Sequence, residues 1–368
     1  MSAVCRSWKA SVVDQKFNFP VCLLLAEKEG SDQRCIYDVS EEILVELDLP
    51  EIRGRRCWGS PFGWLVTCGL DLEFRLFNPL SRASLPLPSL RTFPGYEDEA
   101  WVDFTPEKLC TFFLRKVILS SSPEDSVSDC IVLAVYSYRY LAFAKPGDKA
   151  WTPIDNIHGA ADAIYFKGNV FCCTCDGEIF LCQDLYGSRP KAMKFAPAPP
   201  FTGPTAIYLF DLGGNLCLAF RYAPPLEDED EDEDDDEDED DSEGEEGPYV
   251  YATVGFLIFK LDMQTRDWEK IFSLGDNSLF LGNCYTFVIV AADYHGCRPN
   301  CIYLMEDEAE YYHHTGGTDM GIYDCQNLKL DLDEVDPSVV EPFPKSKDVQ
   351  HLLHSYFSPP LWFIPHSR

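Results

Sequence analysis

The sequence predicts an all-β protein, a β-propeller of six or seven blades. Short β-branched and aromatic segments bounded by Gly, Pro, Asp and Asn dominate the chain, and helical periodicity is rare. A motif made of a strand, a polar turn and a Trp also recurs along the sequence. A pair of β-sandwiches would account for the strands but not for the recurring motif, so the repeat favours the propeller.

The strand signature is clearest in four segments, at residues 130–136, 168–175, 249–260 and 285–292. Two segments have helical spacing instead. The first comprises residues 1–14, in which Val4, Trp8 and Val12 form one apolar stripe. The second comprises residues 346–357, whose stripe contains Val349, Leu352, Leu353 and Tyr356.

The repeat is strongest in residues 142–154 and 258–271. Each copy has a Phe in its strand, a Trp after the turn and an Ile three residues later, namely Phe143, Trp151 and Ile154, and Phe259, Trp268 and Ile271. Weaker copies begin at Cys35, Arg75, Ile179 and Gly321. The two Trp residues are 117 positions apart with one copy between them, and a 20-residue acidic insertion accounts for part of that distance. The step of about 48 residues is typical of WD40 or kelch blades. It predicts about seven kelch-like blades for residues 15–368, although six copies are recognisable.

Charge is concentrated in one tract. The chain has 30 Lys and Arg against 62 Asp and Glu, a formal charge of −32, which excludes a simple cationic binder of nucleic acid or of an anionic membrane. Residues 227–246 hold 18 of the acids and no base. Such a tract cannot bury surface, so we expect a disordered, solvated loop inserted into a hairpin. It is either a harmless expansion or a binder of basic partners, and Ser242 within it is a candidate site for an acid-directed kinase.

The cysteines indicate a reducing compartment. All 16 are scattered without the spacing of a disulfide framework, and no apolar run approaches the length of a membrane span. We therefore expect an intracellular protein of the cytoplasm or nucleus. Cys172, Cys173 and Cys175 have metal-ligand spacing, and Cys297 and Cys301 could supply a second pair. On a strand, however, Cys173 and Cys175 share a face with Phe171 while Cys172 points the other way, so the C-x-x-C pair of Cys172 and Cys175 is split between two faces. We therefore expect packing and no metal or other cofactor.

Other candidate sites have weaker patterns. His313 and His314 stand near Asp307, Glu308 and Glu310, which could bind a metal, but an exposed hairpin tip is the interpretation we favour. The cluster of Arg53, Arg55 and Arg56 fits a solvated loop better than a nuclear-import or phosphate patch.

The sequence contains neither a nucleophile elbow nor a phosphate-binding P-loop. We therefore expect no catalytic residues and no enzymatic activity. An enzyme with a site in the propeller channel is the remaining alternative, because a fold does not fix a function.

The chain as a whole resembles a known family. Its first 14 residues, MSAVCRSWKASVVD, are similar to the last helix of an F-box, and the rest is similar to plant F-box proteins with a KIB-type β-propeller, once catalogued as domain of unknown function 295. The stretches that carry the resemblance are residues 63–65, 76–81, 85–88, 117–123, 162–171, 273–282, 298–304 and 319–324.

The resemblance implies a function and two parts. Such proteins are thought to be non-enzymatic substrate receptors of SCF ubiquitin ligases, in which the F-box docks on a Skp adaptor bound to a cullin and the propeller binds a target protein. It implies an F-box remnant at residues 1–14, with Val4, Cys5, Trp8 and Val12 as candidate adaptor contacts, and a propeller at residues 15–368. Because the two preceding F-box helices are not in the sequence, we expect weak adaptor binding by this remnant alone. The alternative is a free-standing propeller that binds proteins without a ligase.

Overall fold

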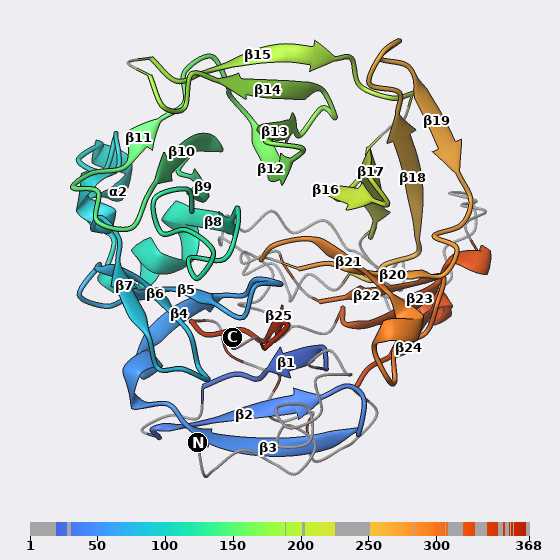
Figure 1. The fold of residues 1–368 in the computed structure, drawn as a ribbon, viewed down its shortest axis with the longest axis horizontal. Helices are drawn as coiled ribbons and strands as arrows, with labels where there is room; N and C mark the ends of the chain where they lie inside the picture. Colours follow the sequence, from blue (N-terminus) through green and yellow to red (C-terminus); the bar gives the residue numbers. More distant parts are fainter. Residues whose placement is uncertain are drawn as a thin grey trace, which may run out of the picture.

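The chain forms a β-propeller of six blades arranged around a central channel (Figure 1). The computed structural model describes residues 20–27, 31–187, 189–200, 203–224, 251–282, 284–305, 307, 319–327, 337–344, 349, 353, 355 and 357–365. Each blade is a sheet of four or five strands that follow one another from the channel to the rim. The predicted all-β propeller is therefore confirmed, with the lower of the two blade numbers.

The first three blades come from the N-terminal half of the chain, except for β25 of blade A, which comes from residues 361–363. From the channel outward, blade A consists of β25 (Leu361–Phe363), β1 (Cys22–Leu24), β2 (Gln33–Asp38) and β3 (Ile43–Asp48). Blade B consists of β4 (Arg55–Trp58), β5 (Leu65–Gly69), β6 (Phe74–Phe77) and β7 (Ser84–Pro86). Blade C consists of β8 (Leu114–Leu119), β9 (Val132–Tyr136), β10 (Tyr140–Ala144) and β11 (Thr152–Pro153).

The remaining blades complete the ring. Blade D consists of β12 (Ala160–Phe166), β13 (Asn169–Thr174), β14 (Ile179–Gln183) and β15 (Lys191–Ala196). Blade E consists of β16 (Ala206–Leu212), β17 (Asn215–Tyr222), β18 (Gly255–Leu261) and β19 (Trp268–Ile271). Blade F has five strands, β21 (Phe287–Val290), β20 (Asn277–Phe280), β22 (Cys301–Leu304), β23 (Gly321–Asp324) and β24 (Val340–Pro342), and its β20 and β22 run parallel.

Helices are short and lie between strands. They are η1 (Pro50–Ile52), η2 (Leu90–Thr92), α2 (Glu99–Val102), α3 (Pro106–Lys108), the π-helical turn η3 (Leu109–Phe113), η4 (Ala291–Asp293), η5 (Cys325–Asn327) and η6 (Pro337–Val339). Within the described ranges, no helix is long and apolar enough to cross a membrane. The predicted helix at residues 1–14 lies outside the described residues. Of the predicted helix at 346–357, Val349 and Leu353 are buried in the core, and Leu352 and Tyr356 lie outside the described residues.

The recurring motif marks the outer hairpin of each blade. The copies that begin at Cys35, Arg75, Ala142, Ile179 and Ile258 contain the third and fourth strands of blades A to E, and the copy at Gly321 begins with β23 of blade F. Six copies therefore correspond to six blades. The estimate of seven was wrong because blade spacing varies: 37 residues separate Ala142 from Ile179, whereas 67 separate Arg75 from Ala142, where α2, α3 and η3 are inserted.

The Trp of the repeat joins neighbouring blades. Trp151 donates its indole N–H to the carbonyl of Pro88, 3.0 Å away, just beyond the outer strand of blade B. Trp268 donates to the carbonyl of Pro197, 2.7 Å away, just beyond the outer strand of blade D. In both cases the indole N–H donates to a backbone carbonyl of the preceding blade. This shared contact explains why a Trp recurs after the turn in both copies of the motif.

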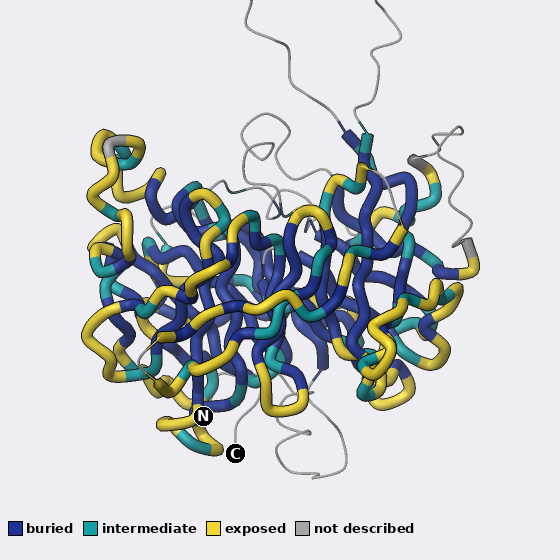
Figure 2. The backbone as a smooth tube through the Cα atoms, turned by 90° about the horizontal axis from the view of Figure 1, so that it is seen from above, coloured by how far each residue is buried: buried dark blue, intermediate teal, exposed yellow. Residues whose placement is uncertain are grey.

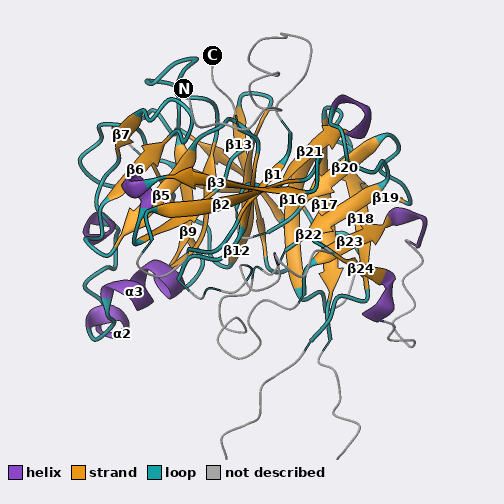
Figure 3. Ribbon diagram, turned by 90° about the horizontal axis from the view of Figure 1, so that it is seen from below, coloured by secondary structure: helices purple, strands orange, loops and turns teal. Residues whose placement is uncertain are grey.

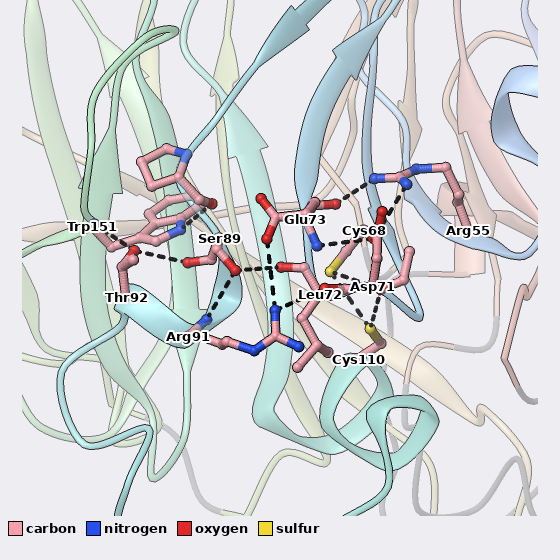
Figure 4. A network of polar contacts seen from close by, with 12 residues as sticks. Arg55, Cys68, Asp71, Leu72, Glu73, Ser89, Arg91, Thr92, Cys110 and Trp151 are labelled. Carbon is pink, nitrogen blue, oxygen red and sulfur yellow. Dashed lines mark hydrogen bonds and ion pairs between the residues drawn. The ribbon is translucent and has the colours of Figure 1, made fainter.

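Buried polar contacts hold the inner strands of blade B together (Figure 4). Arg55 donates to Thr67 at 3.0 Å and to the carbonyl of Glu73, and it pairs with Asp71 at 3.5 Å. Arg56 lies beside it in β4 and is also buried. The prediction that this basic cluster is a solvated loop was therefore wrong for these two residues, because strand register directs both side chains into the molecule. Arg53 alone is exposed, paired with Asp32 at 2.9 Å.

The ring is closed by strands from distant parts of the sequence. Leu23 of β1 pairs with Trp362 of β25 in an antiparallel ladder. Trp362 is buried, and its indole N–H donates to the carbonyl of Leu281 in blade F at 3.1 Å. Blade A therefore holds both the first and the last described strands, which closes the ring at this blade.

Gly59 should be essential for this closure. A Cβ atom at Gly59 would overlap the carbonyl oxygen of Trp362, a backbone atom that no rotamer change can move. We expect Gly59→Ala to lower the free energy of unfolding by about 1–3 kcal/mol or more, measured by urea denaturation. Gly282→Ala is the matched control, because its nearest atoms lie at 3.7 Å and 3.9 Å, ordinary contact distances. Equal stability of the two variants would contradict the closure argument.

The acidic tract enters blade E between β17 and β18, as predicted for a hairpin insertion. The tract lies outside the described residues, but the residues on either side of it are fixed, because Arg221 and Thr253 both bind Asp319. We expect deletion of residues 227–246 to leave the thermal midpoint unchanged within a few degrees, or to raise it by removing like charges.

The thermal midpoint of an Arg221→Met variant provides the contrast to this deletion. It leaves two carboxylates without their shared cation and should lower the midpoint clearly. A large fall caused by the deletion itself would show that the tract contributes to folding.

Candidate protein-binding face

The helices that precede β8 and the connection between β17 and β18 both leave from one face of the propeller. The inner strands β4, β8, β12 and β16 all begin here, and α2, α3 and η3 lead into β8 on this side. The end of β17 pairs with the start of β16, Arg221 opposite Ala206, so the connection that contains the acidic tract also leaves from this side. We call it the insertion face. Figure 3 shows α2 and α3 projecting beyond the sheets, and Figure 2 shows buried segments in the middle of the molecule with exposed loops around them.

A buried carboxylate joins four blades just inside this face. Asp162 in β12 pairs with Lys116 of β8 at 2.8 Å and accepts a hydrogen bond from the backbone N–H of Leu209 in β16 at 2.9 Å. Thr286, which precedes β21, donates to Asp162 at 3.3 Å and also contacts Lys116 at 3.1 Å. Blades C, D, E and F thus meet at one side chain. Complete burial raises the pKa of Asp162, and Lys116 opposes that shift.

A second buried network fixes the base of the tract. The guanidinium of Arg221 binds Asp307 at 2.9 Å, Thr253 at 2.7 Å, and Asp319. Tyr208 donates its hydroxyl to Asp307 at 2.7 Å, and desolvation raises the pKa of Tyr208 well above its usual value. This arrangement was not predicted. Asp307 had been assigned to an exposed hairpin tip, but its side chain is only 13% exposed, because it neutralises a buried arginine.

The mouth of the channel is cationic. A cavity of about 80 Å³ opens on the insertion face, with room for several water-sized groups. The charged side chains among its described lining are Arg56, Arg115, Lys116, Arg139 and Asp307. We call this site the cationic mouth. Four cations beside one anion are unusual in a chain whose net charge is −32.

Exposed aromatic residues stand next to the mouth. Trp101 packs edge-on against Phe104 at 5.2 Å and lies 5.8 Å from Tyr138, and its indole N–H donates to Ser137 at 3.1 Å. Phe112 of η3 continues this surface into the cavity lining. Val102 and Tyr138 are 68% and 61% exposed. We call Trp101, Phe104, Phe112 and Tyr138, with the exposed Val102 beside them, the aromatic ridge.

Comparison with known proteins assigns the fold to a family. A family model described as the KIB1-4 beta-propeller matches residues 36–324, more than three quarters of the chain. The chain belongs to this family. It is a KIB-type propeller of the kind found in plant F-box proteins.

The relatives of this KIB-type propeller are named as F-box proteins. A putative F-box protein of Arabidopsis thaliana is 23% identical over 339 residues, which cover 89% of this chain and 85% of that protein. The Arabidopsis F-box protein SKIP23 is 23% identical over 400 residues, covering all of this chain and 90% of that protein. Another Arabidopsis F-box protein is 40% identical over 212 residues, covering 53% of this chain and 57% of that protein.

Several residues that sequence reasoning singled out do not belong to the described part of the chain. Val4, Cys5, Trp8, Val12 and Ser242 are outside the described residues of the KIB-type propeller, as are His313 and His314. The cationic mouth and the aromatic ridge were not predicted as a site, although Arg56 belongs to the basic cluster for which a phosphate patch was the less favoured interpretation. The residues that line the mouth come from five blades.

The cysteine prediction can be examined in β13. Cys173 packs with Phe171 in one apolar cluster and Cys172 packs in another, which confirms that these two cysteines point to opposite faces. Cys175 lies just beyond β13 and is exposed. The Sγ atoms of Cys172 and Cys182 are 3.9 Å apart, and the hydrogen bond between them and burial raise the pKa of Cys172. Among the residues that the structure describes, no cluster of His, Cys, Asp and Glu has the geometry of a metal site.

The Asp162 contacts should dominate the stability of the KIB-type propeller. Asp162→Asn leaves the buried Lys116 without its counter-ion, so we expect a loss of about 3–5 kcal/mol in the free energy of unfolding. In Lys116→Gln/Asp162→Asn neither charge is buried, and much of the loss should be recovered. A double-mutant cycle by urea denaturation measures this coupling. Losses that simply add would show that the two side chains do not act as a pair.

Proposed function

We propose that this protein is a non-enzymatic substrate-recognition subunit of an SCF-type ubiquitin ligase, with the insertion face as its target-binding surface. Two observations support the proposal. The relatives that match over most of the chain are named as F-box proteins. The insertion face places an exposed aromatic ridge beside a cluster of arginines, the residue types that contribute most binding energy in protein interfaces.

The proposal assigns a separate role to each of the two parts of the chain. Residues 1–14 would contact the Skp adaptor through Val4, Cys5, Trp8 and Val12, and the propeller of residues 15–368 would hold the target. The protein would act in the cytoplasm or nucleus, where the adaptor and cullin occur. The acidic tract would remain a solvated insertion beside the target surface, open to phosphorylation at Ser242.

The test separates the two activities. Residues 15–368 are expressed in plant cells with and without a complete F-box segment taken from SKIP23. We expect both forms to recover the same target proteins in a pull-down and only the F-box form to recover the Skp adaptor and cullin. The abundance of the shared targets should fall several-fold with the F-box form, measured by quantitative proteomics.

A chimera whose F-box is substituted at its adaptor-contacting residues is the control, and it should bind targets without lowering their abundance. If the F-box form bound the adaptor and target but left every target at its normal level, the ligase role would be wrong. Recovery of proteins by the native chain without Skp or cullin would instead support a free-standing interaction module.

A further inference from the structure

We propose that a pocket at the edge of the insertion face binds the guanidinium group of an arginine in the partner protein, and that the aromatic ridge holds the apolar residues beside that arginine. We call it the tyrosine pocket, and the side chains that would contact the guanidinium are Tyr136, Tyr140, Asp155 and His158. This inference rests on the proposed function only in making the arginine part of a degradation target. The binding itself requires nothing from the ligase.

The tyrosine pocket lies in blade C, between two strands and the connection that leads to blade D. Tyr136 ends β9 and Tyr140 begins β10, so the pocket opens at the turn that carries Tyr138 of the aromatic ridge. Its volume is about 300 Å³, at the lower end of the range of roughly 300–1,000 Å³ for ligand pockets. Leu141 and Ile154 add apolar lining. A pocket of this size and composition suits the long, partly apolar side chain of one basic residue.

Aromatic rings form adjoining walls of the pocket. The rings of Tyr136 and Tyr140 are 6.0 Å apart and inclined by 46°, and those of Tyr140 and His158 are 5.4 Å apart and inclined by 72°. Tyr140 is 37% exposed and His158 is also exposed, so part of each ring faces solvent. The face of a tyrosine ring attracts a cation, and a planar guanidinium can lie flat against it.

The charge at the pocket is negative. Asp155 is exposed and lines the pocket, and no Lys or Arg belongs to the described lining. Within the described part of the chain, no basic side chain forms an ion pair with Asp155 either. Burial raises the pKa of Tyr136 to about 12, and Tyr140 and Asp98 add to this rise, so the charge of Asp98 also acts here. Arg139, next to Tyr140 in the chain, lines the channel mouth instead. The complementary ligand is therefore a cation.

The carboxylate of Asp155 stands on a rigid connection. The backbone N–H of Asp155 donates to the carbonyl of Pro190 at 3.0 Å, and its carbonyl accepts from the N–H of Ala192 at 2.8 Å, both at the outer strand of blade D. The next residue, Asn156, has a φ of +64°, in the left-handed region that Asn tolerates better than most residues. An arginine would thus meet a site that is already formed, which lowers the entropic cost of binding.

The surroundings favour a basic, apolar segment over an acidic one. Tyr138 is 61% exposed and lies 5.8 Å from Trp101, so apolar surface is available beside the pocket. The connection of residues 93–113, which carries most of the aromatic ridge, holds five acids and one base. An acidic segment would be repelled there, whereas apolar neighbours of an arginine could bury surface on the ridge.

The test begins with the selection of a ligand. A peptide library with one central arginine and random flanking residues is passed over the immobilised full chain, and retained peptides are synthesised with arginine, citrulline or lysine at the centre. Citrulline keeps the planar shape of arginine without its charge. We expect fluorescence anisotropy to show that arginine peptides bind about five- to tenfold more tightly than their citrulline versions. The lysine versions should bind more weakly than arginine, because a compact ammonium group cannot stack flat on a ring.

An Asp155→Asn variant measures the role of the carboxylate. The substitution removes the charge and keeps the shape, and the thermal midpoint should not change, because Asp155 is exposed. It should weaken binding of the arginine peptides by about threefold or more and leave the citrulline peptides unaffected. Asp267→Asn is the matched control, since Asp267 is an exposed aspartate in the hairpin between β18 and β19, and it should change neither affinity.

Four results would overturn the proposal. Equal binding of arginine and citrulline peptides would remove the role of the charge, and equal effects of Asp155→Asn and Asp267→Asn would remove the role of the pocket. Equal binding of arginine and lysine peptides would contradict the assignment to a guanidinium group. Loss of the arginine preference on deletion of residues 227–246 would make the acidic tract the binding element. Because no ligase component is present, a negative result here leaves the adaptor pull-down untouched.

Discussion

The contacts of Asp162 set the geometry of the channel. A propeller keeps its inner strands close together, yet backbone groups and side chains at the axis have little water to solvate them. Here one carboxylate accepts hydrogen bonds from blades C, E and F while it belongs to blade D. Burying Asp162 without those partners would be costly, so the four blades can take only relative positions that satisfy it. The insertion face, which surrounds the buried pair of Asp162 and Lys116, is therefore held rigidly.

The rim is held by a different and weaker interaction. Trp151 and Trp268 each bridge to the preceding blade through one indole hydrogen bond and the packing of the ring. Phe93 stacks on Trp151 with ring centres 4.4 Å apart, so the joint between blades B and C is also strongly apolar. The contacts of Asp162 at the channel fix the orientation of the inner strands. The contacts of Trp151 and Trp268 fill the space between blades, which widens toward the rim. Together they allow blades of very different length to share one ring.

Whether a feature could be predicted from the sequence depended on how far apart its residues lie along the chain. The outer hairpins were recognisable because strand, turn and Trp lie within about fifteen residues of one another and recur. Arg221 gave no such signal, since its carboxylate partners stand 86 and 98 residues away. The cationic mouth was likewise not predicted as a site. Arg115 and Arg139 meet within blade C through the pairing of β8 and β9, and Arg56 reaches them only because blade B packs beside blade C. The acidic tract dominated the net charge and masked this local excess of cations.

Closure of the ring by β1 and β25 has a consequence for biosynthesis. The ladder joins residues 22–24 to residues 361–363, so blade A cannot be completed until the ribosome has synthesised residue 363. Until then β1 presents an unpaired edge, and Leu281 lacks the indole that it binds in the finished molecule. A nascent chain in this condition is a natural client for chaperones that shield strand edges. Translational pausing before residue 361 would therefore prolong the period in which the protein is most prone to aggregate.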